Sequence, residues 1–338
     1  MSAFMSVVVA VTGVSTLLGE NLLEILESRA FPVARLVLTD PGEVTGRSVM
    51  FSGHATRVVS ADTADFSGVE LVFNCQPDAL PEQFSVSQLS ANVCVIDLCP
   101  DIDVAQTAAC IVPEVNSELI GSGRSGYYVS PLPAVVAAAA VLASLHQRFK
   151  LLRLNIISLS SVAEAGKKGV EALASETAKL LNGRDAEADF FGQQIAFNLL
   201  PLTGQVTASG ATDSETQIST QLRRVLDDEQ LEVAVSSLQL PLFYGQNVVL
   251  HAECQFPVDL NEAQSLLSQA PGVSCIADQI CSAVADAAGK DEVFVSRLRT
   301  EPDNNCGVML FAVTDSMRKG GALNAIQIAE QVFTQLDH

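Results

Sequence analysis

A glycine-rich turn near the start of the chain has residue types and spacing that could hold a nucleotide. In GVSTLLG, Gly13, Thr16 and Gly19 follow an apolar run at residues 7–11 and lead into a segment with helical spacing. In a strand-to-helix turn of this kind, the helix N-terminal amides point at a pyrophosphate. Thr16 stands where glycine is usual, so a turn that only joins a strand to a helix stays an alternative.

An acidic residue follows at the distance expected for ribose recognition. Asp40 lies about 20 residues past the turn, at the end of the second predicted strand. A carboxylate there accepts hydrogen bonds from a ribose 2′-hydroxyl and repels a 2′-phosphate, as would Glu43. The sequence favours NAD over NADP if a dinucleotide binds. The alternatives are that Asp40 caps a surface loop and that the protein has no cofactor.

A second junction, SPLP at residues 130–133, opens a long alanine-rich segment. Proline suits the first position of a helix because its missing N–H would be unsatisfied there. Pro133 is therefore expected to begin a helix, whose small buried side chains we expect to pack against the first-domain sheet. Proline offers no nucleophile to a carbonyl group.

The cysteines and histidines form no recognisable catalytic or metal motif. The eight cysteines include no CxxC pair, which gives no indication of zinc or of a disulfide framework. Reduced, buried thiols in a cytoplasmic protein are the expectation. None of the four histidines, His54, His146, His251 and His338, lies in a motif that would recruit it.

Composition limits the classes of function. The 338 residues are enough for two domains, and the net charge of −20 opposes binding to nucleic acids and anionic membranes. The longest apolar run, at residues 133–145, is shorter than the roughly 20 residues of a membrane span. The apolar start has no basic residue before it and favours a strand over a signal peptide. We therefore expect a soluble, cytoplasmic protein.

The order of apolar segments predicts an α/β fold with a second, α+β domain. Short strands predicted at residues 7–11, 35–39, 71–74 and 93–97 favour a parallel, doubly wound sheet. Past residue 150, longer alternating strands with helices near 167–181 and 212–226 predict a sheet with one face toward solvent or a partner.

Four segments resemble the aspartate-semialdehyde dehydrogenase family in order and spacing. They are GVSTLLGENLLEILESRAFPVARLVLTD, IVPEVNSELI, SLSSVAEAGKKGVEALASETAKLL and DAAGKDEVFVSRLR with DSMRKGGALNAIQIAE. The usg-type branch of the family is the most similar. The resemblance implies an NAD(P)-binding Rossmann domain at residues 1–132, to which a C-terminal helix at 319–338 returns. It also implies a substrate and dimerisation domain at residues 133–318, and a homodimer. It also implies oxidation of aspartate semialdehyde through a cysteine thioester.

The residues that match the family's catalytic positions have changed type. The family's SPNCS-like nucleophile matches Pro133 in SPLPA, and the histidine base matches Gln246 in LPLFYGQ. The arginine for the substrate carboxylate matches Gln239, and the substrate-orienting glutamine matches Ser160. Losing a general base alone costs about a hundredfold to ten-thousandfold in rate.

The phosphate-binding positions have changed as well. The family's phosphate arginine matches Asp103, which reverses the charge, and the lysine and glutamate of the KMVNET-like helix match Gln217 and Gln221. The SAGG loop beside the nicotinamide corresponds to NCQP at residues 74–77. Each lost charge-assisted hydrogen bond removes about 1.5–3 kcal/mol of binding free energy.

Three residues could supply reactive groups in place of the family's changed catalytic residues. Cys75 and Cys99 are the cysteines that the resemblance places nearest the cofactor and phosphate loops, with apolar filling as the alternative. Glu164 could bring a new carboxylate into the old pocket, with a solvated loop residue as the alternative. The resemblance and the turn together place seven residues at a dinucleotide: Gly13, Thr16, Leu17, Leu18, Gly19, Asp40 and Asn324.

Three hypotheses follow. The first is a homodimeric member of the family that is inactive in the family reaction and acts as a sensor or through a heterologous partner, with NAD as its cofactor or with none. The second is an NAD-dependent oxidoreductase that acts on another small aldehyde or ketone without a cysteine nucleophile. The third is an assembly partner of an active dehydrogenase.

Overall fold

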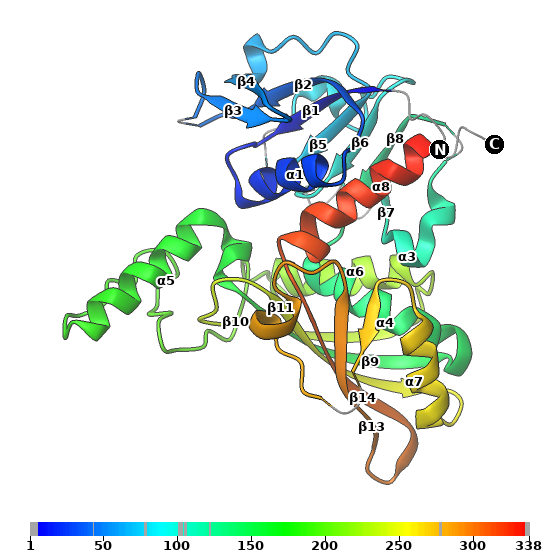
Figure 1. Ribbon diagram of the computed structural model, residues 1–338. Helices are drawn as coiled ribbons and strands as arrows, with labels where there is room; N and C mark the ends of the chain where they lie inside the picture. The colour runs from blue at the N-terminus through cyan, green and yellow to red at the C-terminus, as the bar shows by residue number, and fades with distance from the viewer. Residues whose placement is uncertain are drawn as a thin grey trace. The chain divides into compact units, whose positions relative to one another are not determined.

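The computed structural model describes residues 6–42, 44–77, 80–100, 104, 107–121, 123–276 and 279–334. The chain forms two compact units, Met1–Pro131 with Gly321–His338, and Leu132–Gly320 (Figure 1). Among the described helices, none is both long enough and apolar enough to cross a membrane.

A mostly parallel sheet forms the centre of the first unit. Within the described residues, eight strands lie in the order β3-β4-β2-β1-β5-β6-β8-β7, and only the β3–β4 pair is antiparallel. Their bounds are β1 Val7–Thr12, β2 Val33–Thr39, β3 Ser48–Phe51, β4 His54–Val59, β5 Leu71–Asn74, β6 Cys94–Asp97, β7 Ala109–Cys110 and β8 Gly126–Val129.

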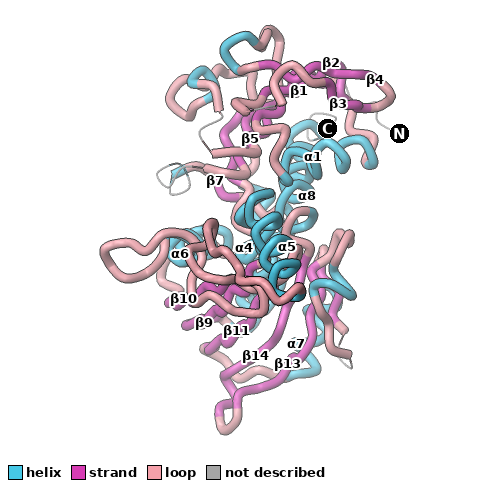
Figure 2. The backbone as a smooth tube through the Cα atoms, turned by 90° about the vertical axis from the view of Figure 1, so that its left-hand side faces the viewer, coloured by secondary structure: helices cyan, strands magenta, loops and turns pink. Residues whose placement is uncertain are grey.

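Two amphipathic helices cover one face of this sheet. Helices α1 (Leu17–Ser28) and α8 (Leu323–Thr334) pack side by side (Figures 1 and 2). Their apolar side chains join those of β1 and β5 in one core. A short helix, α3 (Pro113–Asn116), contacts α8. On the opposite face, loop residues such as Phe66 and Phe84 pack against Val72 and Val95.

The second unit has a mixed sheet. In the described part of the chain its strand order is β10-β9-β11-β14-β13-β12 (Figure 2). The strands are β9 Leu151–Ser160, β10 Glu232–Gln239, β11 Gln246–Cys254, β12 Val273–Cys275, β13 Val293–Glu301 and β14 Asn304–Thr314. The helices are α4 Pro133–Phe149, α5 Gly166–Leu181, α6 Asp213–Val225 and α7 Leu260–Gln269.

Helix α4 packs against the sheet of its own unit. It begins at Pro133, as expected, and contacts β9, β11, β13 and β14 together with α6 and α7. The expectation that it would cover the first-domain sheet was wrong. An apolar, small-residue composition predicts that a helix is buried, but it does not specify which sheet buries it.

The second sheet is covered unevenly. Alternate residues of β9, Leu154, Ile156 and Ser158, are buried on the face that α4 covers. Arg153, Asn155 and Ile157, on the other face, are exposed. The predicted α/β class, with a Rossmann-type parallel sheet and an α+β second domain, is confirmed.

Gly19 permits the close approach of α1 to the turn that precedes it. A Cβ atom at this position would lie 2.6 Å from the Gly13 carbonyl oxygen and 2.8 Å from the Val14 Cα. We expect Gly19→Ala to lower the free energy of unfolding in urea by about 1–3 kcal/mol, because the clash is with backbone. Gly123→Ala is the control, since its Cβ would come no closer than 3.9 Å to another atom. Equal effects of the two substitutions would contradict this account of Gly19.

Candidate functional site

The glycine turn of the first unit leaves two helix amides unpaired. Gly13 has a φ of +71°, and Thr16 caps α1 by accepting a hydrogen bond from the Gly19 N–H at 3.0 Å. The Thr16 hydroxyl also lies 2.9 Å from the Gly13 carbonyl oxygen. Within the described residues, the N–H groups of Leu17 and Leu18 have no hydrogen-bond partner. Both groups are therefore available to an anion at this helix N-terminus.

Asp40 links the end of β2 to this turn. It is 2% exposed, so it is not a surface residue. Its Oδ2 accepts a hydrogen bond from the Ser15 N–H at 2.9 Å, and its Oδ1 accepts one from the Gly42 N–H at 2.8 Å. The carboxylate therefore holds the turn and the strand end together, and each oxygen has a second lone pair for a further donor.

A chain of polar side chains crosses the carboxyl ends of three neighbouring strands, β1, β5 and β6, and ends at Tyr127 of β8. Thr12 Oγ1 donates to Asn74 Oδ1 at 2.8 Å, and Asn74 Nδ2 donates to Asp97 Oδ1 at the same distance. The Tyr127 hydroxyl donates to Asp97 Oδ2. The sequence analysis singled out Asn74 and missed the rest, although polar residues at the ends of consecutive apolar strands were a usable signal.

The two cysteines beside this chain are not poised as nucleophiles. Burial raises the pKa of Cys99 to about 12, and the nearby Asp97 carboxylate adds to the shift. Burial raises the pKa of Cys75 well above its usual range as well. Since the thiolate is the reactive form, the apolar-filler interpretation of both residues is the better supported one.

Asn324, at the start of α8, has one side-chain atom without a partner. Its Nδ2 donates to the Ile111 carbonyl at 3.0 Å and to Ser130 Oγ at 2.9 Å. Its Oδ1 is buried and unpaired in the described part of the chain. A buried acceptor of this kind is costly unless a donor reaches it.

In the second unit, the residues matched to the family's base and substrate positions bond to one another. Gln246, fully buried at the start of β11, accepts a hydrogen bond from Ser160 Oγ at 3.2 Å. Its Nε2 donates to Ser158 Oγ at 3.1 Å and to the Asn247 carbonyl at 2.8 Å. The Nε2 of Gln239 donates to the Ser160 carbonyl at 2.9 Å. The antiparallel pairing of β9 and β11 places Gln246 opposite Ser160.

The start of α4 is tied to α6 through another glutamine. Gln221, 1% exposed, accepts a hydrogen bond from the Leu132 N–H at 3.0 Å. Pro133 packs closely against Gly320, where an added Cβ would lie 2.7 Å from the Pro133 Cβ. Lys319, which the sequence analysis missed, is fully buried beside this contact. Asp103 lies outside the described residues, and Gln217 is half-buried on α6.

Glu164 is not a solvated loop residue. It lies in a short 3₁₀ turn, Val162–Ala165, and its Oε1 is buried without a hydrogen-bond partner among the described residues. Burial raises the pKa of Glu164 to about 8, against the opposing effect of contacts with Ser160 and Ser161. The carboxyl group is therefore mostly protonated near pH 7, and its O–H can donate one hydrogen bond.

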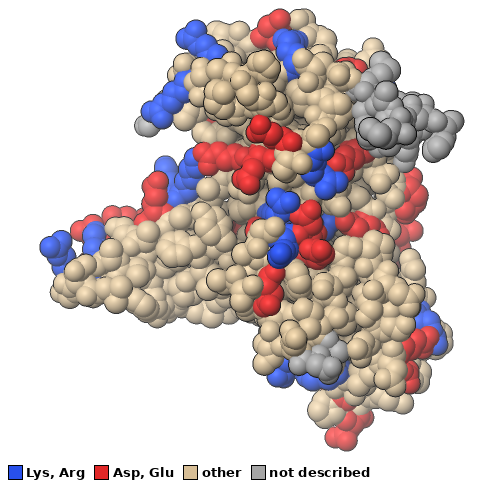
Figure 3. Space-filling model, viewed as in Figure 1, with Lys and Arg blue, Asp and Glu red and all other residues tan. Residues whose placement is uncertain are grey.

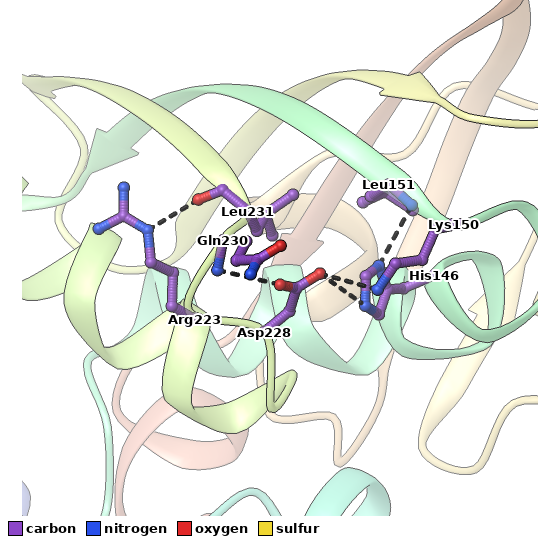
Figure 4. Close-up of polar contacts among 7 residues, drawn as sticks. All are labelled: His146, Lys150, Leu151, Arg223, Asp228, Gln230 and Leu231. Carbon is purple, nitrogen blue, oxygen red and sulfur yellow. Dashed lines mark hydrogen bonds and ion pairs between the residues drawn. The ribbon is translucent and has the colours of Figure 1, made fainter.

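His146 has an acidic partner, but one that lies away from the residues above. Its Nδ1 accepts a hydrogen bond from the Leu151 N–H at 3.2 Å, and its Nε2 lies 3.5 Å from Asp228 Oδ2 (Figure 4). Lys150 Nζ contacts the same carboxylate oxygen at 3.0 Å. Burial, followed by the Lys150 charge, lowers the pKa of His146, and the Asp228 charge opposes the shift. The group therefore joins the end of α4 to the segment before β10.

The described residues contain no group of three or more His, Cys, Asp or Glu side chains arranged to hold a metal ion.

Comparisons with known proteins agree on one family. The sequence profile of the semialdehyde dehydrogenase NAD binding domain matches residues 8–122, and that of the dimerisation domain matches residues 142–319. Aspartate-semialdehyde dehydrogenase 2 of Vibrio cholerae is 33% identical and covers 95% of this chain and 96% of its own. The chain belongs to the aspartate-semialdehyde dehydrogenase family.

Other relatives of this semialdehyde dehydrogenase family member support the same assignment. The USG-1 protein homolog of Azotobacter vinelandii is 35% identical over 97% of this chain and 98% of its own. The crystal structure of aspartate semialdehyde dehydrogenase II from V. cholerae, complexed with ASA, matches with a TM-score of 0.91 at 32% identity and covers 97% of this chain and 98% of the other. The predicted family, with its NAD(P)-binding and dimerisation domains, is confirmed.

The shifted pKa of His146 predicts a pH-dependent stability. Its folded pKa lies below the unfolded value of 6.5, so the unfolded chain takes up the proton first as the pH falls. This contribution to stability is complete above about pH 6.5 and is lost as the pH falls through the folded pKa. We expect His146→Gln to flatten the slope of unfolding free energy against pH between about pH 5 and 6.5. The exposed His54 gives the control His54→Gln, and identical slopes in all three proteins would contradict the assignment.

The raised pKa of Glu164 predicts that its contribution to stability changes with pH in the opposite direction. Its folded pKa of about 8 exceeds the unfolded value of 4.5, so the stability it contributes is complete below pH 4.5 and is lost as the pH rises through 8. We expect Glu164→Gln to gain in melting temperature over the wild type as the pH rises from 5 to about 9. Glu171→Gln, at an exposed position on α5, is the control. Parallel curves for Glu164→Gln and the wild type would show that this carboxyl titrates normally.

Proposed function

We propose that this chain is a homodimeric member of the family that has lost the family reaction and acts as a nucleotide-binding sensor or assembly partner. The main support for this proposal is the hydrogen bonding of two glutamine side chains. Gln246, matched to the catalytic base, has both amide atoms hydrogen-bonded to neighbouring protein atoms, and Gln239, matched to the substrate arginine, has its amide nitrogen bonded to the Ser160 carbonyl. These bonds leave few groups for a substrate carboxylate.

The chemistry of the family reaction supports the loss. Thioester formation needs a thiolate nucleophile and a base that accepts its proton. Pro133, at the matched nucleophile position, supplies neither sulfur nor a proton, and the Gln246 amide cannot relay a proton near neutral pH. Glu164, mostly protonated near pH 7, gives no anion-binding charge in place of the lost arginine.

Homodimer formation is proposed through the second unit, which we assign as residues 133–318. Its match to the dimerisation domain supports this. On the face shown in Figure 3, charged side chains line the upper edge of the arm that contains α5, and the surface below that edge is largely uncharged. Large apolar side chains are exposed along α5 and the loops beside it, namely Leu181, Phe190, Phe197, Leu199, Leu202 and Val206. Apolar exposure on this scale is typical of a surface that another chain covers.

A dinucleotide fits the first unit, assigned as residues 1–132 with 319–338. The unpaired amides of Leu17 and Leu18 suit a pyrophosphate, and Gly13, Thr16 and Gly19 shape the turn that presents them. The unpaired Oδ1 of Asn324 suits an amide donor such as that of nicotinamide. The buried carboxylate of Asp40 favours NAD over NADP.

A second candidate function is hydride transfer to another small aldehyde or ketone. The same free amides and the same Asn324 acceptor support it, since hydride transfer needs a bound nicotinamide and no thiol. It predicts that NADH raises the melting temperature and that some small carbonyl compound consumes NADH. If none of the nicotinamide cofactors changes the melting temperature, this candidate fails.

A third candidate is an assembly partner of an active semialdehyde dehydrogenase in the cytoplasm. It predicts that the two chains co-purify and that mixed dimers are found by native mass measurement. Only homodimers, in a mixture that contains both chains, would reject it.

The proposed nucleotide site is tested by removing one amide. Thr16 has φ −73° and ψ 163°, a conformation that suits a residue before proline, and Leu17 is the first residue of α1. We expect Leu17→Pro to keep the fold and to weaken NAD binding, measured by calorimetry, by about 10- to 100-fold through loss of one N–H. Leu17→Ala keeps the N–H and is the matched control.

The same calorimetric titration, repeated with other ligands, tests the cofactor preference and the loss of the substrate site. We expect NAD and NADH to bind more tightly than NADP and NADPH, and aspartate and inorganic phosphate to give no heat. Tighter binding of NADP would contradict the role of Asp40, and saturable binding of phosphate in the second unit would contradict the loss of its clamp.

A further inference from the structure

Two cysteines of the second unit face each other across neighbouring strands. The antiparallel register of β11 and β14 runs from Gln246 opposite Thr314 to Glu253 opposite Gly307. Continuing this register by one step along both strands brings Cys254, the last residue of β11, opposite Cys306. Both strands are irregular on their outer sides at this point, β11 in its pairing with β9 and β14 in its pairing with β13.

Both sulfur atoms are on the same face of the sheet. Leu250 and Ala252 precede Cys254 at alternate positions, and Val308 and Leu310 follow Cys306 in the same way; these four residues are buried together. Directly opposed residues in an antiparallel pair have Cα atoms about 4.5–5.5 Å apart, within the range that a disulfide spans. The pair can therefore be joined without a change of register.

The backbone on both sides of the pair is held in place. Gln255 N–H donates to the Lys150 carbonyl at 2.7 Å, and Val258 N–H donates to the Asn305 carbonyl at 2.8 Å. The Cys306 N–H donates to Asn304 Oδ1 at 3.0 Å. These bonds fix the ends of the two strands, so little chain entropy is lost when the sulfurs meet.

The two thiols differ in access to solvent. Cys306 is half-buried, whereas Cys254 is 3% exposed. Burial, together with the charge of a Cys306 thiolate, raises the pKa of Cys254 to about 11. Cys306 is thus the sulfur that an oxidant in solution reaches, and Cys254 is the sulfur beside it.

We propose that Cys254 and Cys306 form an oxidisable dithiol that closes to a cross-strand disulfide. Hydrogen peroxide oxidises the Cys306 thiol to a sulfenic acid and releases one water. The Cys254 sulfur then loses its proton and attacks the sulfenic sulfur, which forms the S–S bond and releases a second water. A small dithiol reductant reverses the reaction. The bridge closes the segment that contains α7, β12 and β13.

Peptide mapping of the intact chain tests the proposal. The reduced protein is treated with a small molar excess of hydrogen peroxide, unfolded in urea so that buried thiols react, and alkylated. Digestion by trypsin with a glutamyl endopeptidase separates Cys254, in residues 254–262, from Cys275 and Cys281, in residues 263–290, and from Cys306, in residues 300–318. We expect two of the eight cysteines to escape alkylation and the 254–262 and 300–318 peptides to be linked.

Serine substitutions of single cysteines identify the two sulfurs that form the bridge. Cys254→Ser should leave Cys306 as a sulfenic acid that dimedone traps, with no bridge, and Cys306→Ser, at a partly exposed position, should leave all remaining thiols alkylated. Cys275→Ser is the control and should still form the bridge. A disulfide between Cys275 and Cys281 or between two chains, or trapping of Cys306 in the wild type with no loss of the Cys254 thiol, would overturn the proposal.

Discussion

The polar interior of the second unit depends on one constraint, the hydrogen bonding of the buried Gln246 side chain. Its side chain is fully buried, and its oxygen and nitrogen are occupied by Ser160, Ser158 and the Asn247 carbonyl. A buried amide that lost these partners would cost about 1–3 kcal/mol for each unsatisfied group. The network therefore stabilises the sheet, and the same bonds occupy the groups that would otherwise contact a ligand.

In the first unit, by contrast, the polar groups are not all occupied. Close packing shapes its glycine turn, and two N–H groups of the turn have no hydrogen-bond partner among the described residues. Gly13 and Gly19 leave no room for a Cβ, while Leu17 and Leu18 present free amides. An anion-binding turn in the first unit, together with the proposed loss of substrate binding in the second, is a combination that suits a protein that detects a nucleotide.

The sequence predicted the fold class and the longer strands, because continuous apolar runs such as β1 and alternating ones such as β9 are local signals. It missed β3, β4, β7, β8 and β12, which are short and mixed in composition, and it assigned α4 to the wrong sheet. The pairing of Gln246 with Ser160 depends on strand register between segments far apart in the sequence. The turn that contains Glu164 is likewise held by distant residues, Leu242 and Phe243. Residue types alone could not supply that information.

The central claim is that the family reaction has been lost, and steady-state turnover tests it most directly. Pure protein is supplied with aspartate semialdehyde, inorganic phosphate and either NAD or NADP, and the reduced nicotinamide is followed by absorbance. We predict no product above the protein-free blank with either cofactor. Steady turnover that Gln246→Ala abolishes, in protein that remains folded, would contradict the account.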